Sequence, residues 1–149
     1  MAIARGAGTE ILRAHHFEDI DSTNQILIVG VQHHIYTVLS VIVHTKAIQA
    51  AGNVIELAIT GYDSKAGTTA QEVTFLQQSM NVNETFVWNE KIVFNGFEPT
   101  DFSGALDDAT KQDAIADQGS SVSQHLKLHT EHADDGYEVN VTFIDQNNS

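Results

Sequence analysis

The 149-residue sequence contains no cysteine. Disulfide bonds, thiolate metal sites and cysteine nucleophiles are therefore excluded, and packing and hydrogen bonds must hold the fold together. At this length we expect one domain, which removes roughly 70% of its unfolded surface from water. A core of that size needs no covalent cross-links.

Long apolar runs are also absent. The longest apolar stretch, residues 35–43, is interrupted by Tyr36, Thr37 and Ser40, and it is far shorter than the roughly 20 residues that span a bilayer. Residues 1–6 lack the apolar core of a signal peptide. These features predict a soluble protein that is made in a cytoplasm and has no membrane partner.

Basic residues are scarce, because seven lysines and arginines stand against twenty acidic residues, a formal net charge of −13. Such a charge repels phosphate backbones, so nucleic acid is not an expected partner. Acidic side chains are most concentrated in residues 98–117, which we interpret as a solvated acidic face. A calcium site is the alternative, but the segment lacks the Asp-x-Asp-x-Asp-Gly spacing that places oxygens around one ion.

Short runs of β-branched and aromatic residues recur from residue 25 onward, separated by turn-forming residues. About eight such runs fit into the rest of the chain, the spacing of an antiparallel β-sandwich or jelly roll. The predicted strands are residues 26–29, 35–45, 53–62, 72–77, 84–88, 91–94, 122–130 and 137–144. We therefore predict an all-β sandwich or jelly-roll domain over residues 25–149.

Two of these strands carry specific expectations. Residues 35–45 are apolar on both faces, which predicts a central strand buried on both sides. Residues 122–130 alternate strictly, with Leu126 and Leu128 opposite His125 and Lys127.

The connections carry two further expectations. Asn89-Glu90, between two short strands, predicts either a tight hairpin or a bulged continuation. Residues 103–119 break the β pattern and predict one short helix or a long loop, which usually carries function or contacts.

Residues 1–24 differ from the rest of the chain. Early glycines, apolar residues scattered among charges and histidines, and a turn-forming run at residues 19–24 give no strand pattern. We interpret residues 1–24 as an extended N-terminal arm outside the core, able to order on a partner but not to fold alone. The expected partner contacts in this arm are Ile3, Arg5, Ile11, Leu12, Arg13 and Phe17.

The eight histidines are the strongest candidates for metal ligands. His125 and His129 would share one face of a helix, but the alternation around them predicts a strand, on which they lie roughly 13 Å apart. Adjacent pairs such as His33-His34 point to opposite faces of a strand. One histidine from each of three subunits could still meet a metal on a symmetry axis. Otherwise we expect exposed polar histidines, with no metal and no other cofactor.

No residue pattern points to catalysis. Ser40 lies inside an apolar run and lacks the Gly-x-Ser-x-Gly turn that exposes a nucleophile. Any two of the twenty acidic residues could approach as a glycosidase pair, and nothing favours a particular pair. Phe86 and Trp88 share a strand face and are interpreted as core or interface packing. We predict no catalytic residue and a non-enzymatic protein.

Three segments carry a resemblance to a known group of proteins. They are Ile-Tyr-Thr-Val at residues 35–38, Phe-Val-Trp-Asn at 86–89 followed by Lys-Ile-Val-Phe-Asn-Gly at 91–96, and Val-Thr-Phe-Ile-Asp-Gln at 141–146. Over most of residues 25–149, and also over the arm, the chain resembles the small β-sandwich virion structural proteins of tailed phages, especially marine cyanophages.

The chain departs from that group at two places. Leu39-Ser40-Val41 continues a strand that many of these proteins end with a Pro-Ala-Gly turn, and the insertion at residues 97–121 is longer than usual. The resemblance implies a jelly-roll subunit, often a trimer, that sits on the outer surface of the capsid. It also implies that an arm or edge strand grips the major capsid protein.

The sequence therefore leads to the hypothesis of a capsid decoration or cement protein that binds the assembled head and stabilises it. The acidic surface favours the outside of a head over its DNA-lined interior. A tail, neck or fibre-knob subunit is the first alternative. The others are a carbohydrate-binding module that presents Trp88, Tyr62 or Tyr137, and a hydrolase with unrecognised carboxylates.

Overall fold

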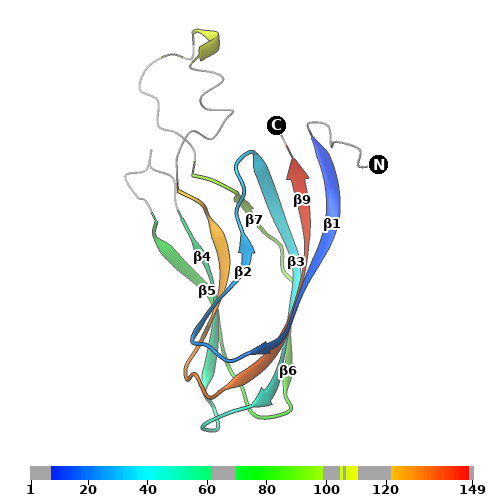
Figure 1. Ribbon diagram of the computed structural model, residues 1–149, viewed down its shortest axis with the longest axis vertical. Coiled ribbons are helices and arrows are strands. Elements are labelled where there is room, and N and C mark those ends of the chain that lie inside the picture. The colour runs from blue at the N-terminus through cyan, green and yellow to red at the C-terminus, as the bar shows by residue number, and fades with distance from the viewer. Residues whose placement is uncertain (1–7, 62–69, 99–104, 106, 111–121, 148–149) are drawn as a thin grey trace.

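The computed structural model describes residues 8–61, 70–98, 105, 107–110 and 122–147. Nine β-strands in this part of the chain form two antiparallel sheets, which confirms the predicted all-β sandwich (Figure 1). Sheet A contains β1 (Thr9–Ile20), β9 (Gly136–Asn147), β3 (His34–Ala47), β6 (Thr85–Trp88) and β7 (Ile92–Asn95). Sheet B contains β2 (Asn24–Val29), β8 (His125–Thr130), β4 (Val54–Thr60) and β5 (Glu72–Ser79).

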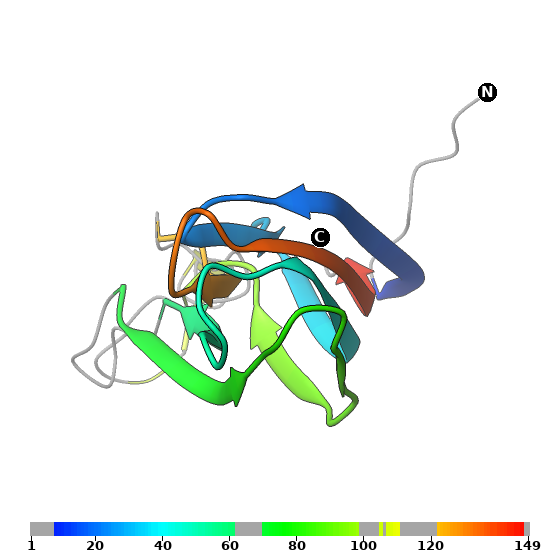
Figure 2. The same ribbon diagram turned by 90° about the horizontal axis from the view of Figure 1, so that it is seen from below.

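The strand pairing is that of a jelly roll. β1 pairs with β9, β2 with β8, β3 with β6 and β7, and β4 with β5. These are the pairs of one long hairpin that folds back between β4 and β5. Rolling the hairpin distributes its strands over two sheets and adds the β3–β9 and β4–β8 ladders. Figure 2 views the molecule from one end, down its long axis.

β6 and β7 behave as one interrupted strand. Val41 pairs with Trp88 and Val38 pairs with Ile92, both antiparallel and both with the same strand, β3. Asn89-Glu90 therefore lies in a bulged continuation, which was one of the two predicted alternatives, and not in a tight hairpin. Counting β6 and β7 together gives the eight strands of a jelly roll.

The core lies between the facing sides of the two sheets. Val139 and Val141 of β9 and Leu126 and Leu128 of β8 are fully buried, and each such side chain stabilises the fold by about 1.5–3 kcal/mol. The alternation predicted for residues 122–130 is confirmed, because the histidines and the lysine of β8 point the other way and remain partly exposed.

The structure differs from the expected loose arm over residues 9–20. This segment is β1, the first strand of the jelly roll, and it pairs with β9 from Thr9 to Ile20. Ile20 is 2% exposed and belongs to the core. The sequence pattern does not predict this strand, because Arg13 and His15 occupy positions where a buried strand normally carries apolar residues.

Two other expectations have different outcomes. The strand predicted at residues 35–45 is central in sheet A, but only one of its faces is buried, since the outward Leu39 and Ile42 stay half-buried. The prediction of burial on both sides is therefore wrong for the single chain. The helix or long loop predicted at residues 103–119 falls mostly outside the described residues.

Two glycines allow the backbones of the two sheets to approach each other at one end of the sandwich. Gly30 donates a hydrogen bond to the carbonyl of Gln124 at 2.8 Å, and Gln124 donates one to the carbonyl of Gly96 at 2.9 Å. A Cβ atom at Gly96 would overlap the carbonyl group of Val31, and one at Gly30 would overlap the carbonyl oxygens of Gly96 and Gln124. No other residue type fits at these positions without backbone movement.

The substitution Gly96→Ala should lower the free energy of unfolding by about 2 kcal/mol or more, because the added methyl group forces two backbones apart. Urea denaturation followed by tryptophan fluorescence measures the change. Gly136→Ala is the matched control, since a Cβ atom there meets its nearest neighbours at 3.6 Å, an ordinary contact distance. Equal losses in the two variants would contradict the close approach at Gly96.

Candidate interaction surfaces

Cross-strand pairing places apolar side chains in rows on the outer face of sheet A. The first row crosses β1, β9, β3 and β7 in that order and consists of Leu12, Ile144, Thr37 and Val93. Because side chains alternate along a strand, all four point away from the core. Leu12 is 67% exposed and Val93 is 60% exposed. This row is open to solvent at both ends.

A second row crosses the same face on β1, β9, β3 and β6 and consists of His16, Asn140, Ile42 and Val87. Between the two rows lie Ala14, Thr142 and Ser40, which are paired with one another, and Leu39 at the register shift of β3. We call these two rows and the residues between them the apolar face.

The two rows themselves contain no Asp, Glu, Lys or Arg, although the chain has a net charge of −13. Exposed Glu90 and Lys91 lie between the rows on the segment that joins β6 and β7. His16 of the second row pairs with Glu138 at 3.3 Å. Among the described residues that follow in register, Glu10 lies beyond the first row and Glu138 lies beyond the second. Contiguous apolar patches on soluble proteins often mark interaction sites. The apolar face is therefore the first candidate for an interaction surface.

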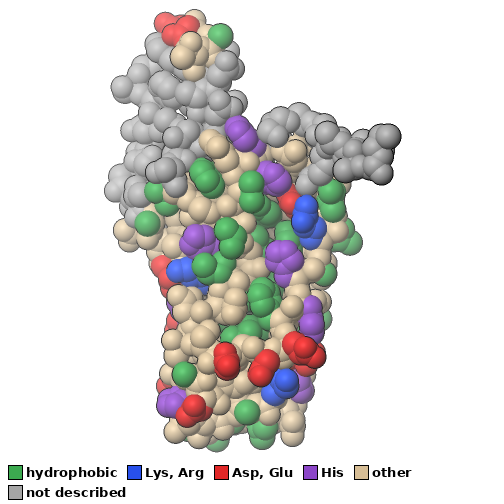
Figure 3. All heavy atoms as spheres, in the orientation of Figure 1, with side chains coloured by type: hydrophobic (Ala, Val, Ile, Leu, Met, Phe, Trp, Pro, Cys, Tyr) green, Lys and Arg blue, Asp and Glu red, His purple; other side chains and the backbone are tan. Residues whose placement is uncertain are grey.

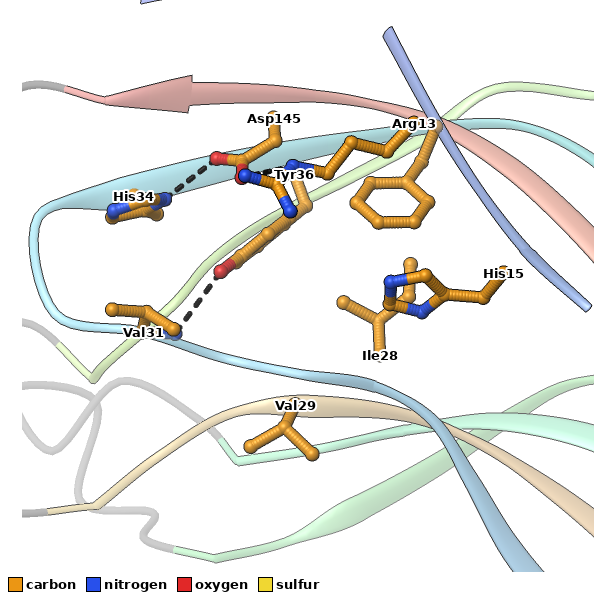
Figure 4. Close-up of a pocket in the computed structure, with 9 residues that line it drawn as sticks. Arg13, His15, Ile28, Val29, Val31, His34, Tyr36 and Asp145 are labelled. Atoms are coloured by element: carbon orange, nitrogen blue, oxygen red, sulfur yellow. Dashed lines mark hydrogen bonds and ion pairs between the residues drawn. The ribbon is translucent and has the colours of Figure 1, made fainter. Parts of the chain in front are cut away.

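A pocket of about 170 Å³ opens between β1 of sheet A and β2 of sheet B (Figure 4). Figure 3 shows hydrophobic side chains gathered along the middle of the same side of the molecule, with histidines to either side. The pocket is lined by Arg13, His15, Ile28, Val29, Val31, His34, Tyr36, Phe143 and Asp145. Side chains of both sheets thus meet at this opening.

Asp145 is the centre of a polar cluster in the pocket. Its side chain is 5% exposed, and its carboxylate forms an ion pair with Arg13 Nε at 3.1 Å and contacts His34 Nδ1 at 2.6 Å. These residues come from β9, β1 and β3, so the cluster joins three adjacent strands of sheet A. We call it the Asp145 clasp.

Two further polar groups of the pocket are also engaged. The hydroxyl group of Tyr36 accepts a hydrogen bond from the backbone N–H of Val31 at 3.2 Å. His15 Nδ1 lies 2.9 Å from the carbonyl oxygen of Leu27 and must therefore carry the hydrogen. These bonds link side chains to the strand and loop that form the pocket wall.

The structure distributes the expected partner contacts of residues 1–24 over different sides of the molecule. Ile11 and Phe17 are half-buried, and Phe17 packs against the core. Leu12 lies on the apolar face, and Arg13 belongs to the Asp145 clasp. Ile3 and Arg5 lie outside the described residues, so their contact with a partner stays a prediction.

Sequence reasoning missed Val87, Val93 and Ile144 as surface residues. All three lie in runs that read as ordinary β-strands, and alternation alone does not say which face of a strand stays uncovered. Burial of Phe94 and Trp88, at 6% and 8% exposed, fixes the outward direction of their neighbours. The sequence indicated an uncovered apolar surface only through residues 35–45, which are apolar on both faces of the strand.

The histidines do not converge on a metal. In the described part of the chain, no group of three His, Cys, Asp or Glu side chains could hold an ion. On β8, His129 Nε2 contacts Glu72 Oε1 at 2.5 Å, and Lys127 Nζ lies 3.7 Å from Glu72 Oε2. Burial, together with the charge of Lys127, lowers the pKa of His125. The same described residues contain no helix long and apolar enough to cross a membrane.

The aromatic residues suggested for sugar binding are buried where the structure describes them. Trp88 is 8% exposed and its ring lies 5.2 Å from that of Phe75 across the two sheets. Tyr137 is fully buried, and burial together with the nearby Asp135 carboxylate raises the pKa of Tyr137 to about 12. Neither ring is available as a platform for a sugar, and Tyr62 lies outside the described residues.

Comparison with known proteins gives only distant likenesses. No family model matches the chain, and no curated protein matches it. Among solved structures, the chain is similar to a protein of the infectious bursal disease virus Gx strain, with 9% identity and a TM-score of 0.46 over 96% of this chain. It spans 32% of that viral protein.

A second likeness is to a protein of Bacillus endospore appendages, a family of disulfide-linked pili, with 12% identity and a TM-score of 0.42. It covers 100% of this chain and 97% of the pilus protein. The VP2 protein in particles derived from infectious bursal disease virus gives 10% identity and a TM-score of 0.42, over 99% of this chain and 38% of VP2. At these values the likenesses carry no argument about function.

The substitution Asp145→Asn should lower the free energy of unfolding by about 1–3 kcal/mol, because it removes the charge of a buried carboxylate that pairs with Arg13 and His34. Urea denaturation measures the loss. Asp134→Asn is the control: Asp134 lies 3.6 Å from His132 Nδ1 and its side chain is 80% exposed, so its change should stay within about 0.5 kcal/mol. A comparably small effect at Asp145 would show that the clasp does not hold the sheet.

Proposed function

We propose that this chain is a non-enzymatic structural subunit of a virus particle, a decoration or cement protein on the outer surface of a tailed-phage head. The apolar face of sheet A carries the proposal. An isolated monomer would leave its exposed Leu12, Val87 and Val93 in water, whereas a subunit of an assembly covers them. The resemblance of residues 25–149 to virion proteins of tailed phages supports the choice of particle.

Charge supports the outer surface of the head. The net charge of −13 would repel the packaged DNA inside a capsid, but it costs little on the outside, where water and counterions surround the protein. Binding to assembled capsid in preference to free capsid subunits would then stabilise the head by mass action. No chemistry is required of the protein in this role.

The major capsid protein is the proposed partner of the N-terminal region. Among the strands of the described residues, β1 pairs with β9 alone and is an edge strand. An open edge offers backbone N–H and C=O groups to another chain. We assign the partner contact to this edge and to the residues that precede it, including Ile3 and Arg5. The same proposed contact includes Ile11, Leu12, Arg13 and Phe17 of β1. Arg13 also pairs with Asp145, and Phe17 also packs against the core.

A position in the tail or neck is the second proposal for the same structural role. It would use the same edge but far fewer copies of the protein in each particle. Quantitative mass spectrometry of purified virions separates the two, since hundreds of copies indicate the head and a few indicate the tail.

Deletion of residues 2–7 should weaken binding to heads at least tenfold while leaving all nine strands intact. A deletion of residues 1–24 would instead remove β1 and the buried Ile20, and so would confuse binding with folding. Co-sedimentation with heads from a phage that lacks the gene measures the affinity.

A matched pair of variants refines the test of this segment. The double substitution Ile3→Ser with Arg5→Ser should reproduce the deletion, whereas Ala2→Ser with Ala4→Ser, in the same segment, should bind like the wild type. Full binding by the deleted protein would show that the segment before β1 does not contact the capsid.

A further inference from the structure

We infer that the pocket between β1 and β2 receives an aromatic side chain from an extended segment of the partner protein, which adds to sheet A along the open edge of β1. The same segment carries an acidic residue two positions after the aromatic one, where it meets Arg13. This inference rests on the proposed function, because it gives the chemistry of the partner segment that the edge of β1 binds.

The edges of both sheets meet at this pocket, and they differ in what they offer a partner. β2 is the edge strand of sheet B among the described residues. Side chains already bind two of its carbonyl groups, since His15 bonds to that of Leu27 and the amide of Gln25 donates to that of Ile26. β1 keeps a regular register with β9 from Thr9 to Phe17, so alternate residues turn their N–H and C=O groups to the open side. Such an edge binds an extended chain.

A strand added beside β1 would present alternate side chains to the pocket. It would lie about 4.8 Å from β1, and its inward side chains would point toward sheet B. Arg13 and His15 occupy successive inward positions of β1, because they pair with the buried Phe143 and Val141. These positions are roughly 7 Å apart. In an antiparallel strand, the residue opposite His15 comes two positions before the residue opposite Arg13.

The size and walls of the pocket suit an aromatic ring. Its volume is about 170 Å³, and a cavity of about 150 Å³ is large enough to bind benzene. The rings of His15 and Tyr36 lie 4.9 and 5.9 Å from that of Phe143, in edge and tilted arrangements that a further ring can join. Val29 and Val31, also in the lining, are 59% and 50% exposed, so the opening is apolar (Figure 4).

Charge selects an acidic neighbour for the aromatic residue. Residues 22–55 supply five of the nine lining residues and contain no Asp or Glu, although the chain has twenty acidic residues. Asp145 is the one carboxylate in the lining, and it is already held by Arg13 Nε and His34 Nδ1. A guanidinium group has five N–H donors, and no described residue pairs with the terminal nitrogens of Arg13. A carboxylate is their strongest acceptor.

The other acidic groups near the pocket do not compete for Arg13. Glu10 of β1 points to the outer face of sheet A, and Glu18 is five residues from Arg13, roughly 17 Å along the strand. On the outer face of sheet B, Glu72 contacts Lys127 and His129. In the part of the chain that the structure describes, Arg13 can therefore accept a second carboxylate from a partner.

Titration of the ¹⁵N-labelled full chain with acetyl-Thr-Val-Phe-Thr-Asp-Val-Thr-amide tests the inference by NMR. Amide shifts should change along β1 and at Val29 and Val31, with a dissociation constant of about 1 mM or lower. Replacing the phenylalanine of the peptide by alanine should weaken binding at least tenfold, because the pocket stays empty. Replacing its aspartate by asparagine should weaken binding several-fold. Equal affinity of the three peptides, or no shifts at several millimolar peptide, would overturn the inference.

Two aspartate substitutions in the protein locate the contact. Val29→Asp, at a position 59% exposed in the pocket lining, should weaken peptide binding at least tenfold. Val93→Asp, at a strand position 60% exposed on the outer face of sheet A, adds the same charge and should leave the affinity unchanged. Circular dichroism and the urea midpoint verify that both variants fold. Equal weakening by the two substitutions would contradict the assigned pocket.

Methylation of one peptide N–H group at a time tests the added strand. Binding should fall at every second position, because alternate N–H groups of an edge strand face its neighbour. A loss that does not alternate along the peptide would show that the segment does not pair with β1.

The outcomes separate this inference from the proposed function. If the peptide binds at the pocket but the protein does not join phage heads, the partner chemistry stands and the role in the virion fails. If the protein joins heads and Val29→Asp joins them equally well, the structural role stands and the inference fails. If the same amides shift when only the protein concentration is raised, the occupant is a second copy of this chain, which also overturns the inference.

Discussion

The ladder between β3 and β9 is the interaction on which the rest of the structure depends. β9 lies in the middle of sheet A and holds β3 on one side and β1 on the other. Its inward residues Val139 and Val141 are fully buried, so the strand cannot leave the sheet without opening the core. The Asp145 clasp and the rows of the apolar face each need residues from β1, β9 and β3. Both features therefore exist only after the two ends of the chain have met, a non-local contact of the kind that slows folding.

The two sides of sheet A contribute differently to the stability of the single chain. The inner side supplies the stability of the single chain through fully buried valines and aromatic residues. The outer side contributes little to that stability, because Leu12, Val87 and Val93 are at least half exposed. The two rows on this side contain no Asp, Glu, Lys or Arg, although the chain as a whole carries −13.

Much of the jelly roll follows from local patterns. The alternation in β8 and β9, the turn residues between the runs and the interrupted strand at Asn89-Glu90 are properties of neighbouring residues, and these elements are where the sequence predicts them. β1 is the exception, since its inward positions include Arg13 and His15. Arg13 is compatible with the strand because Asp145, far away in the sequence, supplies its countercharge. No local pattern contains that partner, so the strand reads as a loose arm.

The sequence by itself determined the class of the fold, the absence of disulfides and thiolate metal sites, the strongly acidic surface and the apolar character of both faces of β3, because composition and side-chain alternation are local quantities. Only the tertiary structure decided which of those faces is covered, that β1 completes the roll, and that Leu12, Ile144, Thr37 and Val93 form one row. The physical reason is register. A row across a sheet is set by hydrogen bonds between strands distant in the chain, and a shift of one residue would turn the same side chains to the opposite face.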